Sequence, residues 1–301
     1  MTDVAVVIGN YEGAALLPEC IESLRKQTQQ PVDLVVADAR SIDNSREIAE
    51  QLGARVLELD NRGLGSLYNA GVRATTTPYV LLSNNDVAYD LRCVEQLVAA
   101  LDEDSQRFAA DARQLDWEDG HVLKARTTLA RGPLLREYVP GLHLEHAAHA
   151  DGLVPTVAAH GAAMLVRRSM FLELGGFDET FFMDSEDLDL CWRAWLRAWP
   201  SVYVPEAWLR HRVGAVTTPQ VLPRRLVSSH HNMLRFALKC LPLGATARVF
   251  AGELLRLPRH PRVITPALAR VARELPEILR LRRELRPTGE LLDWMLRGQP
   301  A

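Results

Sequence analysis

Short β-branched apolar runs alternate with amphipathic segments along the first part of the chain. Val4 to Ile8 is a continuous apolar run, which is typical of a parallel strand buried on both faces. Leu16 to Gln27 then places its apolar residues at helical spacing, and Leu34 to Ala37 is again strand-like. The alternation continues with helices expected over 45–52 and 65–74 and strands expected over 55–59 and 79–83. This order predicts an α/β fold with a mostly parallel mixed sheet flanked by helices.

The pattern is less regular in the middle of the chain. A helix is expected over 93–101, and Asp119-Gly120 is a strong signal for a hairpin turn. The stretch from Thr127 to Val157 contains Gly132-Pro133, Pro140-Gly141 and Pro155, so we expect a long irregular loop there. A strand over 162–166 and a short helix over 168–174 are predicted to follow.

Helical periodicity returns from Leu226 onward, where prolines 242, 258, 261 and 266 are expected to break the helices. Between Val221 and Ala301 fourteen Arg and one Lys stand against five Glu and one Asp. We therefore divide the chain into a domain of residues 1–220 and a basic helical C-terminal extension of residues 221–301. The domain itself is divided at residue 90 into two halves, 1–90 and 91–220.

Composition narrows the class of protein. With 48% hydrophobic and 24% charged residues, the chain is typical of a folded globular protein, and its net charge of −3 argues against a nucleic-acid partner. The first apolar run is too short for a signal-peptide core, and no apolar stretch reaches the eighteen residues of a membrane span. Four scattered cysteines form no C-x-x-C pair, so a cytoplasmic location is expected.

Polar or glycine-rich sequence follows each of the first four predicted strands. The segments are GNYEG, DARSIDNS, DNRGLG and NNDV. In open α/β sheets, ligands bind outside the carboxyl ends of the strands, so these loops should build the site. Gly63 and Gly65 suggest a dinucleotide fingerprint, but Tyr68 occupies the position of its third glycine.

Carboxylates form the main chemical signals. Asp86 follows a buried strand in S-N-N-D-V, where it could bind a divalent cation, although an ordinary solvated turn has the same composition. Four acids lie within FFMDSEDLD before an amphipathic segment, more than helix capping requires. Among them Asp187 is the candidate general base and Glu186 its partner at the acceptor. His211 is either a structural histidine or a further metal ligand.

In order along the chain, these segments resemble the family 2 glycosyltransferases with the GT-A (Rossmann-like) fold, in their rhamnosyltransferase-like bacterial branch. The resemblance runs from about residue 4 to 240 through VVIGNYEG, VVADARSIDNS, NRGLGSLYNAGV, LLSNNDV, GAAMLVRRSMFLELGGFDETFF, EDLDLCWRAW and HRVGAV. Asn84-x-Asp86 replaces the usual Asp-x-Asp, Glu12 the usual Asn, and Gly9 the usual Pro. The segment CWRAWLRAW stands where processive synthases have Q-x-x-R-W, which favours transfer of a single sugar.

The resemblance implies that 1–90 is the nucleotide-binding half of the domain and 91–220 the acceptor and catalytic half. It also implies roles for particular residues. Asp86 and His211 would bind Mg²⁺ or Mn²⁺, Asp187 would be the base, and Glu186 and Trp192 would contact the acceptor. The nucleotide would be bound by Asn10, Glu12, Asp38, Asp43, Arg62, Gly63, Asn69, Asn84 and Asn85.

We therefore expect an inverting, metal-dependent transfer of one sugar from a nucleotide-diphosphate sugar, either dTDP-rhamnose or a UDP-sugar. The acceptor would be a hydroxyl of a growing cell-surface glycan or a lipid-linked glycan. A nucleotidyltransferase is less favoured, because GNYEG has no Lys or Arg after the first strand; a catalytically inactive nucleotide-binding module is a further alternative. The basic extension is either a solvated face or a peripheral contact with the anionic inner face of the plasma membrane.

Overall fold

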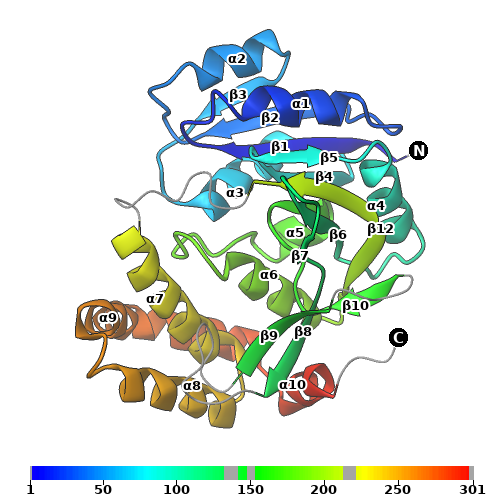
Figure 1. Cartoon of the computed structure of the whole chain (residues 1–301). Helices are drawn as coiled ribbons and strands as arrows, with labels where there is room; N and C mark the ends of the chain where they lie inside the picture. Colours follow the sequence, from blue (N-terminus) through cyan, green and yellow to red (C-terminus); the bar gives the residue numbers. More distant parts are fainter. Residues whose placement is uncertain (1, 132–141, 148–152, 213–221, 298–301) are drawn as a thin grey trace.

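The computed structural model describes residues 2–131, 142–147, 153–212 and 222–297. Its first half is a parallel sheet in which β1 (Val4–Asn10) lies between β2 (Asp33–Asp38) and β4 (Tyr79–Asn84). The short strand β3 (Arg55–Glu58) extends it beyond β2, also in parallel. The carboxyl ends of β1, β2 and β4 therefore lie along one edge of the sheet, as the sequence predicted (Figure 1).

The second half makes the sheet mixed. The strand β11 (Ala163–Arg167) is antiparallel to β4 and to β6 (Ala109–Asp116), and β12 (Ser201–His211) is parallel to β6. The long strand β12 also carries two short antiparallel strands, β5 (Val87–Tyr89) and β10 (Val154–Thr156). The predicted hairpin at Asp119-Gly120 is confirmed, because β7 (Val122–Lys124) turns back onto β6.

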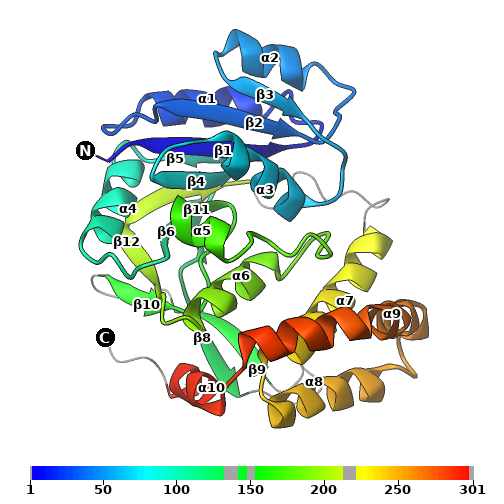
Figure 2. The same cartoon turned by 180° about the vertical axis from the view of Figure 1, so that it is seen from behind.

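Helices cover both faces of this sheet (Figures 1 and 2). Because side chains alternate across a strand, Val4, Val6 and Ile8 of β1 share one hydrophobic cluster and Val7 belongs to the other. The helices of the first 212 residues are α1 (Leu17–Arg25), α2 (Ser45–Gln51), α3 (Leu64–Ala74), α4 (Cys93–Asp102), α5 (Arg168–Glu173) and α6 (Glu186–Trp195). The predicted α/β class with flanking helices is confirmed.

The expected irregular loop from Thr127 to Val157 is wrong in part. β8 (Arg126–Arg131) and β9 (Leu142–Ala147) pair as a separate antiparallel sheet, and β10 joins the main sheet. The Gly-Pro and Pro-Gly signals mark the boundaries of these strands, and the pairing that stabilises them is distant in sequence. Residues 132–141 and 148–152 lie outside the described part of the chain.

The described residues 222–297 form four helices: α7 (Leu222–Cys240), α8 (Leu243–Arg256), α9 (Pro261–Leu285) and α10 (Gly289–Leu296). Pro242, Pro258 and Pro261 fall between helices or at a helix start, as expected. Pro266 lies inside α9, so the break predicted there is wrong; α9 also continues through Pro276. Each proline removes one backbone donor, and the apolar face of α9 compensates by burying four side chains. These are Ile264, Ala267, Val271 and Ile278.

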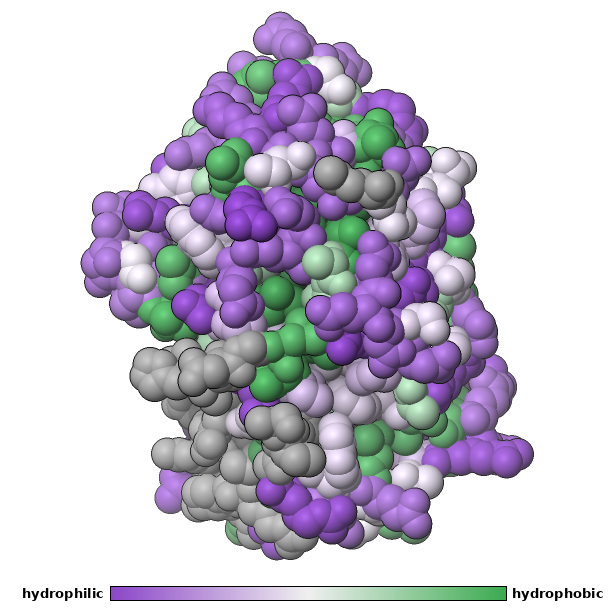
Figure 3. All heavy atoms as spheres, turned by 90° about the vertical axis from the view of Figure 1, so that its right-hand side faces the viewer, coloured by the Kyte–Doolittle hydropathy of each residue, from purple (hydrophilic) through white to green (hydrophobic). Residues whose placement is uncertain are grey.

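The surface is polar over much of its area. The face drawn in Figure 3 is largely hydrophilic, with hydrophobic side chains in smaller groups between. Among the residues that the structure describes, no helix is both long enough and apolar enough to cross a bilayer.

Candidate active site

Three strand ends are joined by hydrogen bonds between side chains. The amide of Asn10, at the end of β1, donates to Oδ2 of Asp38, at the end of β2, over 2.7 Å. Asn85, in the turn after β4, donates its own amide proton to Oδ1 of Asn10 over 2.6 Å. All three side chains are at least 95% buried, so they form a fixed polar floor where the sequence predicted nucleotide binding.

The loop after β2 is held by its own acids. Asp38 accepts hydrogen bonds from the backbone N–H and the hydroxyl of Ser41, at 2.8 and 2.7 Å. With Asn10 as a third donor, this fully buried carboxylate is occupied in shaping the loop. Any contact of Asp38 with a nucleobase therefore stays a prediction.

The other two acids of this region connect the loops after β1 and β2. Glu12 accepts a hydrogen bond from the N–H of Ile42 over 2.9 Å, and Asp43 accepts one from the N–H of Ala14 over 3.0 Å. Although burial raises the pKa of Asp43, hydrogen bonds from Ser45 and Ala14 outweigh it and the pKa lies below its usual value. The two loops are thus fastened to one another.

Asp86 and His211 meet, as predicted. Asp86 lies in the turn after β4 and His211 at the end of β12, and Nε2 of His211 is 3.2 Å from Oδ1 of Asp86. On the other side of the ring, Nδ1 is 2.9 Å from the amide oxygen of Gln114. Because that oxygen only accepts, Nδ1 donates to it, and Nε2 is the nitrogen that faces the carboxylate.

This pair fits a divalent cation. Oδ1 of Asp86 is buried and forms no hydrogen bond with the described residues. In the neutral ring, Nε2 offers a lone pair 3.2 Å from that carboxylate oxygen, and a cation bound by both atoms would give the oxygen a partner. Carboxylate oxygen and imidazole nitrogen are suitable donors for a divalent ion such as Mn²⁺. Gln114 is a positioning residue that the sequence analysis missed.

Tyr68 lies within electrostatic reach of both acidic centres, Asp86 and the pair Glu186–Asp187. Its hydroxyl is 3.0 Å from Oδ1 of Asn84 and 2.8 Å from the carbonyl oxygen of Gly161. Burial raises its pKa well above the usual value, and the negative charges of Glu186 and Asp86 raise it further. The tyrosine that interrupts the glycine fingerprint is therefore part of the site, in contact with the predicted residue Asn84.

The acidic turn before α6 has a strained backbone. Asp184 and Ser185 both have φ of +69°, which is uncommon for residues with a side chain. Helix α7 holds this turn from the other side, because Arg225 binds both carboxylate oxygens of Asp184 at 3.0 and 3.1 Å. Asn232 adds hydrogen bonds to the carbonyl oxygens of Met183 and Asp184 at 2.8 and 2.7 Å.

Glu186 and Asp187 follow directly, in the first turn of α6. Both are half-buried. Burial, together with the neighbouring charge of Asp187, raises the pKa of Glu186 to about 8. A carboxyl with such a pKa retains its proton near neutral pH, so the pair favours a single negative charge.

Arg62, Gly63 and Asn69 join α3 to the segment before the acidic turn. Asn69 exchanges two hydrogen bonds with the backbone of Phe177, at 2.8 and 2.9 Å, and Arg62 is 3.0 Å from Glu179. Gly63 has φ of +105°, and a Cβ there would lie 2.3 Å from the carbonyl oxygen of Phe182. These residues position the acidic segment, and their predicted contact with a diphosphate stays a prediction.

Trp192 does not lie at a surface that an acceptor could reach. Its indole is 1% exposed, donates to the carbonyl oxygen of Cys240 over 3.1 Å and packs edge-on against Phe236. The predicted acceptor contact is therefore corrected to a packing role. The apolar face of α6 is covered by α7, a helix that begins thirty residues after Trp192 in the sequence.

A second buried acid–imidazole pair was missed from the sequence. His160 donates its backbone N–H to Asp111 over 3.0 Å, and its Nδ1 lies 3.0 Å from the other oxygen of that carboxylate. Burial raises the pKa of Asp111, His160 opposes this, and the charge of Asp187 adds to the rise. The pair thus lies within electrostatic reach of Asp187, directly before Gly161.

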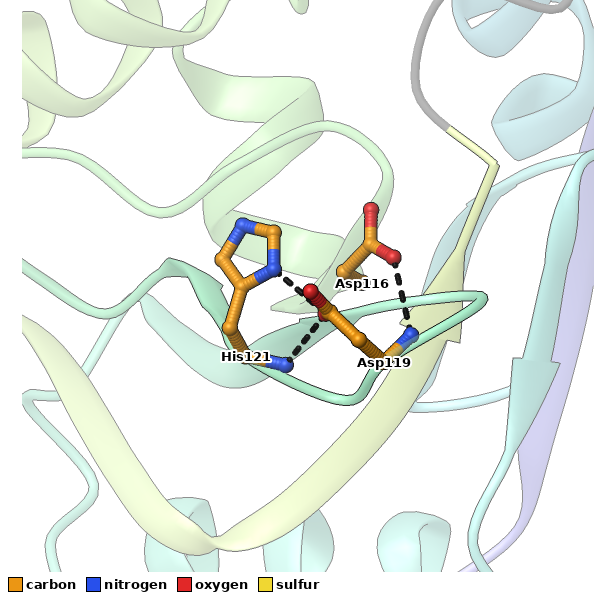
Figure 4. A group of neighbouring side chains, drawn as sticks. All are labelled: Asp116, Asp119 and His121. Carbon is orange, nitrogen blue, oxygen red and sulfur yellow. Dashed lines mark hydrogen bonds and ion pairs between the residues drawn. The ribbon is translucent and has the colours of Figure 1, made fainter.

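One further cluster, Asp116, Asp119 and His121, lies in the hairpin between β6 and β7 (Figure 4). Asp119 accepts from the backbone N–H of His121 and is 2.5 Å from its Nδ1, while Asp116 accepts from the N–H of Asp119. The carboxylates thus close the turn itself, and the cluster is largely exposed.

The fold and site together define a class. A sheet with a polar cradle at its parallel strand ends, a carboxylate–imidazole pair beside it and an acid pair at a helix start is the arrangement of a nucleotide-dependent GT-A transferase. The sequence profile of Glycosyl transferase family 2 matches residues 5–174, so the chain belongs to that family. It is a glycosyltransferase of the rhamnosyltransferase-like branch that transfers a sugar from a nucleotide sugar.

Two named relatives illustrate that branch. The chain is 29% identical over 256 residues to N-acetylglucosaminyl-diphospho-decaprenol L-rhamnosyltransferase of Mycobacterium tuberculosis, covering 77% of this chain and 82% of the relative. It is 25% identical over 219 residues to the O-antigen chain rhamnosyltransferase WbaN of Salmonella anatum, covering 70% of this chain and 66% of WbaN. These matches favour sugar transfer over nucleotidyl transfer.

Solved structures share the fold. GalNAc-T7, solved with UDP, GalNAc and Mn²⁺, superposes with a TM-score of 0.72 at 14% identity over 99% of this chain; the chain spans 56% of its length. The mannosyltransferase PcManGT of Pyrobaculum calidifontis, solved with GDP-Man and Mn²⁺, superposes with a TM-score of 0.55 at 15% identity. The match covers 98% of this chain and 85% of PcManGT. The predicted GT-A fold is confirmed.

Proposed function

We propose that this enzyme transfers one sugar, with inversion, from dTDP-rhamnose or a UDP-sugar to a hydroxyl of a growing cell-surface glycan or lipid-linked glycan. One observation carries the proposal: the buried hydroxyl of Tyr68 lies within electrostatic reach of the acid pair Glu186–Asp187 and also of Asp86, which is 3.2 Å from His211. Acid–base chemistry and diphosphate binding thus occur in one site. The names of the two rhamnosyltransferases support the sugar, and decaprenol in one name supports a lipid-linked acceptor.

The donor lies at the strand ends in this proposal. Asn10, Asp38 and Asp43 hold the nucleobase and ribose, and Glu12 stabilises their loop. Arg62 and the glycine backbone at position 63 face the diphosphate. Asn69, Asn84 and Asn85 complete the donor site.

Asp86 and His211 would hold Mg²⁺ or Mn²⁺. The donor set fits either ion, and both structural relatives were solved with Mn²⁺. When bound, such an ion would neutralise negative charge on the departing nucleoside diphosphate.

Asp187 accepts the proton of the attacking hydroxyl, whose oxygen forms the new bond to the anomeric carbon as the bond to the diphosphate breaks. Glu186, protonated near neutral pH, donates a hydrogen bond to the acceptor. One base on the acceptor side produces inversion in a single displacement.

Asp187→Asn tests the assignment of the base. The amide keeps the shape of the side chain but cannot accept the proton, so turnover should fall on the order of 10³-fold. Nucleotide binding, measured as a thermal shift, should persist. Asp119→Asn, the same change in the exposed hairpin, is the control; turnover retained in Asp187→Asn would place the base elsewhere.

A panel of UDP, dTDP and GDP, each with EDTA or Mn²⁺, tests the donor site. One nucleotide should raise the melting temperature more than the others, and only with the metal. Absence of any shift would instead support an inactive module.

We place the enzyme in the cytoplasm, docked peripherally on the inner face of the plasma membrane through residues 221–301. Four free, buried cysteines agree with a reducing compartment.

A further inference from the structure

Helix α8 exposes apolar residues on the side that faces away from the protein. Its inner side buries Thr246, Val249, Gly252 and Glu253. On its outer side Leu243 is 74% exposed. Leu254 and Leu255 are 54% and 53% exposed. A helix with one packed face normally presents polar residues to water, so this pattern is reversed.

The exposed apolar residues form one continuous face. At about 100° per residue, they all lie within roughly 120° of the helix circumference. We call these five residues the α8 outer face: Leu243, Ala247, Ala251, Leu254 and Leu255. Both cartoon views place α8 at the outer edge of the helical extension, on the far side from the sheet (Figures 1 and 2).

The exposed charges that flank this face along the chain have one sign. Between residues 241 and 273 every exposed charged side chain is an arginine, including Arg248, Arg259 and Arg262. The acid in this stretch, Glu253, is 1% exposed and 2.7 Å from Nδ1 of His230. The segment that contains the α8 outer face therefore exposes positive charge only.

The exposed leucines of α9 have different neighbours. Leu275 and Leu279 are 38% and 40% exposed, and the exposed acids Glu277 and Glu284 lie on the same helix. Arg280 is paired with Glu284 at 2.7 Å. A mixed surface of this kind is ordinary for a solvated helix, which makes α9 a suitable control.

We infer that the α8 outer face docks on an anionic lipid bilayer, with its leucines in the interface and the three arginines on lipid phosphates. Apolar residues flanked by arginine are the composition of interfacial helices, and each cation near an anionic surface strengthens binding. A second copy of the chain fits less well, because it would bring two sets of arginines together. The inference rests on the proposed function in one respect: a lipid-linked acceptor gives the enzyme a reason to dock.

Flotation with vesicles tests the inference. The full-length protein should float with phosphatidylcholine vesicles that contain phosphatidylglycerol, remain at the bottom with phosphatidylcholine alone, and bind less as salt rises. L254Q/L255Q and R248Q/R259Q/R262Q should each weaken binding at least about tenfold. The control variants carry the same kinds of substitution on α9. They are L275Q/L279Q and R280Q/R283Q, and both should float like the parent protein.

The inference is overturned if the parent protein stays at the bottom with anionic vesicles, or if the α8 and α9 variants float equally. Sedimentation equilibrium that shows a dimer, dissociated by L254Q/L255Q, would assign the face to self-association. Nucleotide-induced thermal shifts, measured without lipid, report on the donor site separately. If the parent protein does not float but nucleotides still raise its melting temperature, only the docking inference is refuted. If it floats but no nucleotide raises its melting temperature, only the proposed function is refuted.

Discussion

At the scale of single residues, Gln114 determines which nitrogen of His211 faces Asp86. Its amide oxygen binds Nδ1 over 2.9 Å, so the other nitrogen is free to coordinate. In Gln114→Met this acceptor is lost and the ring is no longer fixed in orientation. We expect Mn²⁺ affinity, measured by isothermal titration calorimetry, to fall about 10- to 100-fold.

Gln106→Met, the same substitution at an exposed position, is the control and should leave the affinity unchanged. Equal affinities for the two variants would show that the orientation of His211 does not depend on Gln114. Because the measurement is of metal binding, it is independent of turnover.

Glu186 makes stability depend on pH. Its pKa is raised to about 8 in the folded protein, so the folded state holds a proton that the unfolded chain releases. This contribution to stability is complete below the ordinary carboxyl pKa and is lost as pH rises to about 8. In Glu186→Gln the melting temperature should decline less between pH 5 and 8 than in the parent protein. A parallel decline in both would contradict the raised pKa.

Local motifs were informative for residues at strand ends and at the start of α6. Asp86 and His211 were paired through the order of segments along the chain, and the structure brings them together. Gln114 and Tyr68 gave no such signal, because their partners are distant in the sequence. Gln114 is 97 residues from His211, and Tyr68 is 16 residues from Asn84 and 93 from Gly161. For Trp192, sequence position suggested the acceptor side, whereas helix α7 covers it.

At the scale of elements, helix α7 acts as a clamp on the acidic turn. Asn232 binds the carbonyl oxygens of two consecutive residues, the second of which has a left-handed backbone. Asn232→Leu removes both bonds and should let the turn relax, moving Asp187 away from its working position. We expect kcat to fall about 10- to 100-fold while nucleotide-induced thermal shifts persist.

Ser229→Ala, on the same helix, provides the comparison. A similar loss of kcat in both variants would indicate a general effect on α7 and not a specific role of the clamp. The clamp is also supported by Arg225, so a double change with Arg225→Ala should cost more than either single change.

The parallel strands and the helices that follow them were predictable because their patterns are local. The β8–β9 sheet was not, because its pairing joins segments on either side of a Gly-Pro and a Pro-Gly pair. Helix α9 continues through Pro266 and Pro276 because packing on its buried face outweighs local preference.

At the scale of the whole molecule, buried ion pairs join the first 220 residues to the extension. Lys239 of α7 is 2% exposed and lies 2.5 Å from Asp178 and 2.7 Å from Asp189. Arg235 also binds Asp178, and Arg193 binds Asp189. The division at residue 220 stays a prediction. Asp178 and Asp189 lie before that residue, whereas Arg235 and Lys239 lie after it.

Lys239→Met should destabilise the protein by about 3 kcal/mol, because two buried carboxylates lose a common partner. Chemical denaturation measures this, and Lys26→Met, at an exposed site directly after α1, should change stability little. A small effect of Lys239→Met would show that the remaining arginines suffice.

Acid should weaken the same network. Burial raises the pKa of Asp178, but Lys239 and Arg235 outweigh it and hold the pKa well below its usual range. The resulting stability is present above the ordinary carboxyl pKa and is lost as pH falls below it. Counting charges in the sequence showed that the extension is basic. It could not show that Arg235 and Lys239 are buried against carboxylates.

The ion pairs of Asp178 and Asp189 also decide how the chain could be recombined with a relative. Exchanging only residues after 220 would transplant Arg235 and Lys239 without the carboxylates that receive them. A chimera joined near Leu174, where the family match ends, would keep donors and acceptors from one parent. In such a chimera, the acidic turn, α6 and the helices α7 to α10 should therefore come from the same parent.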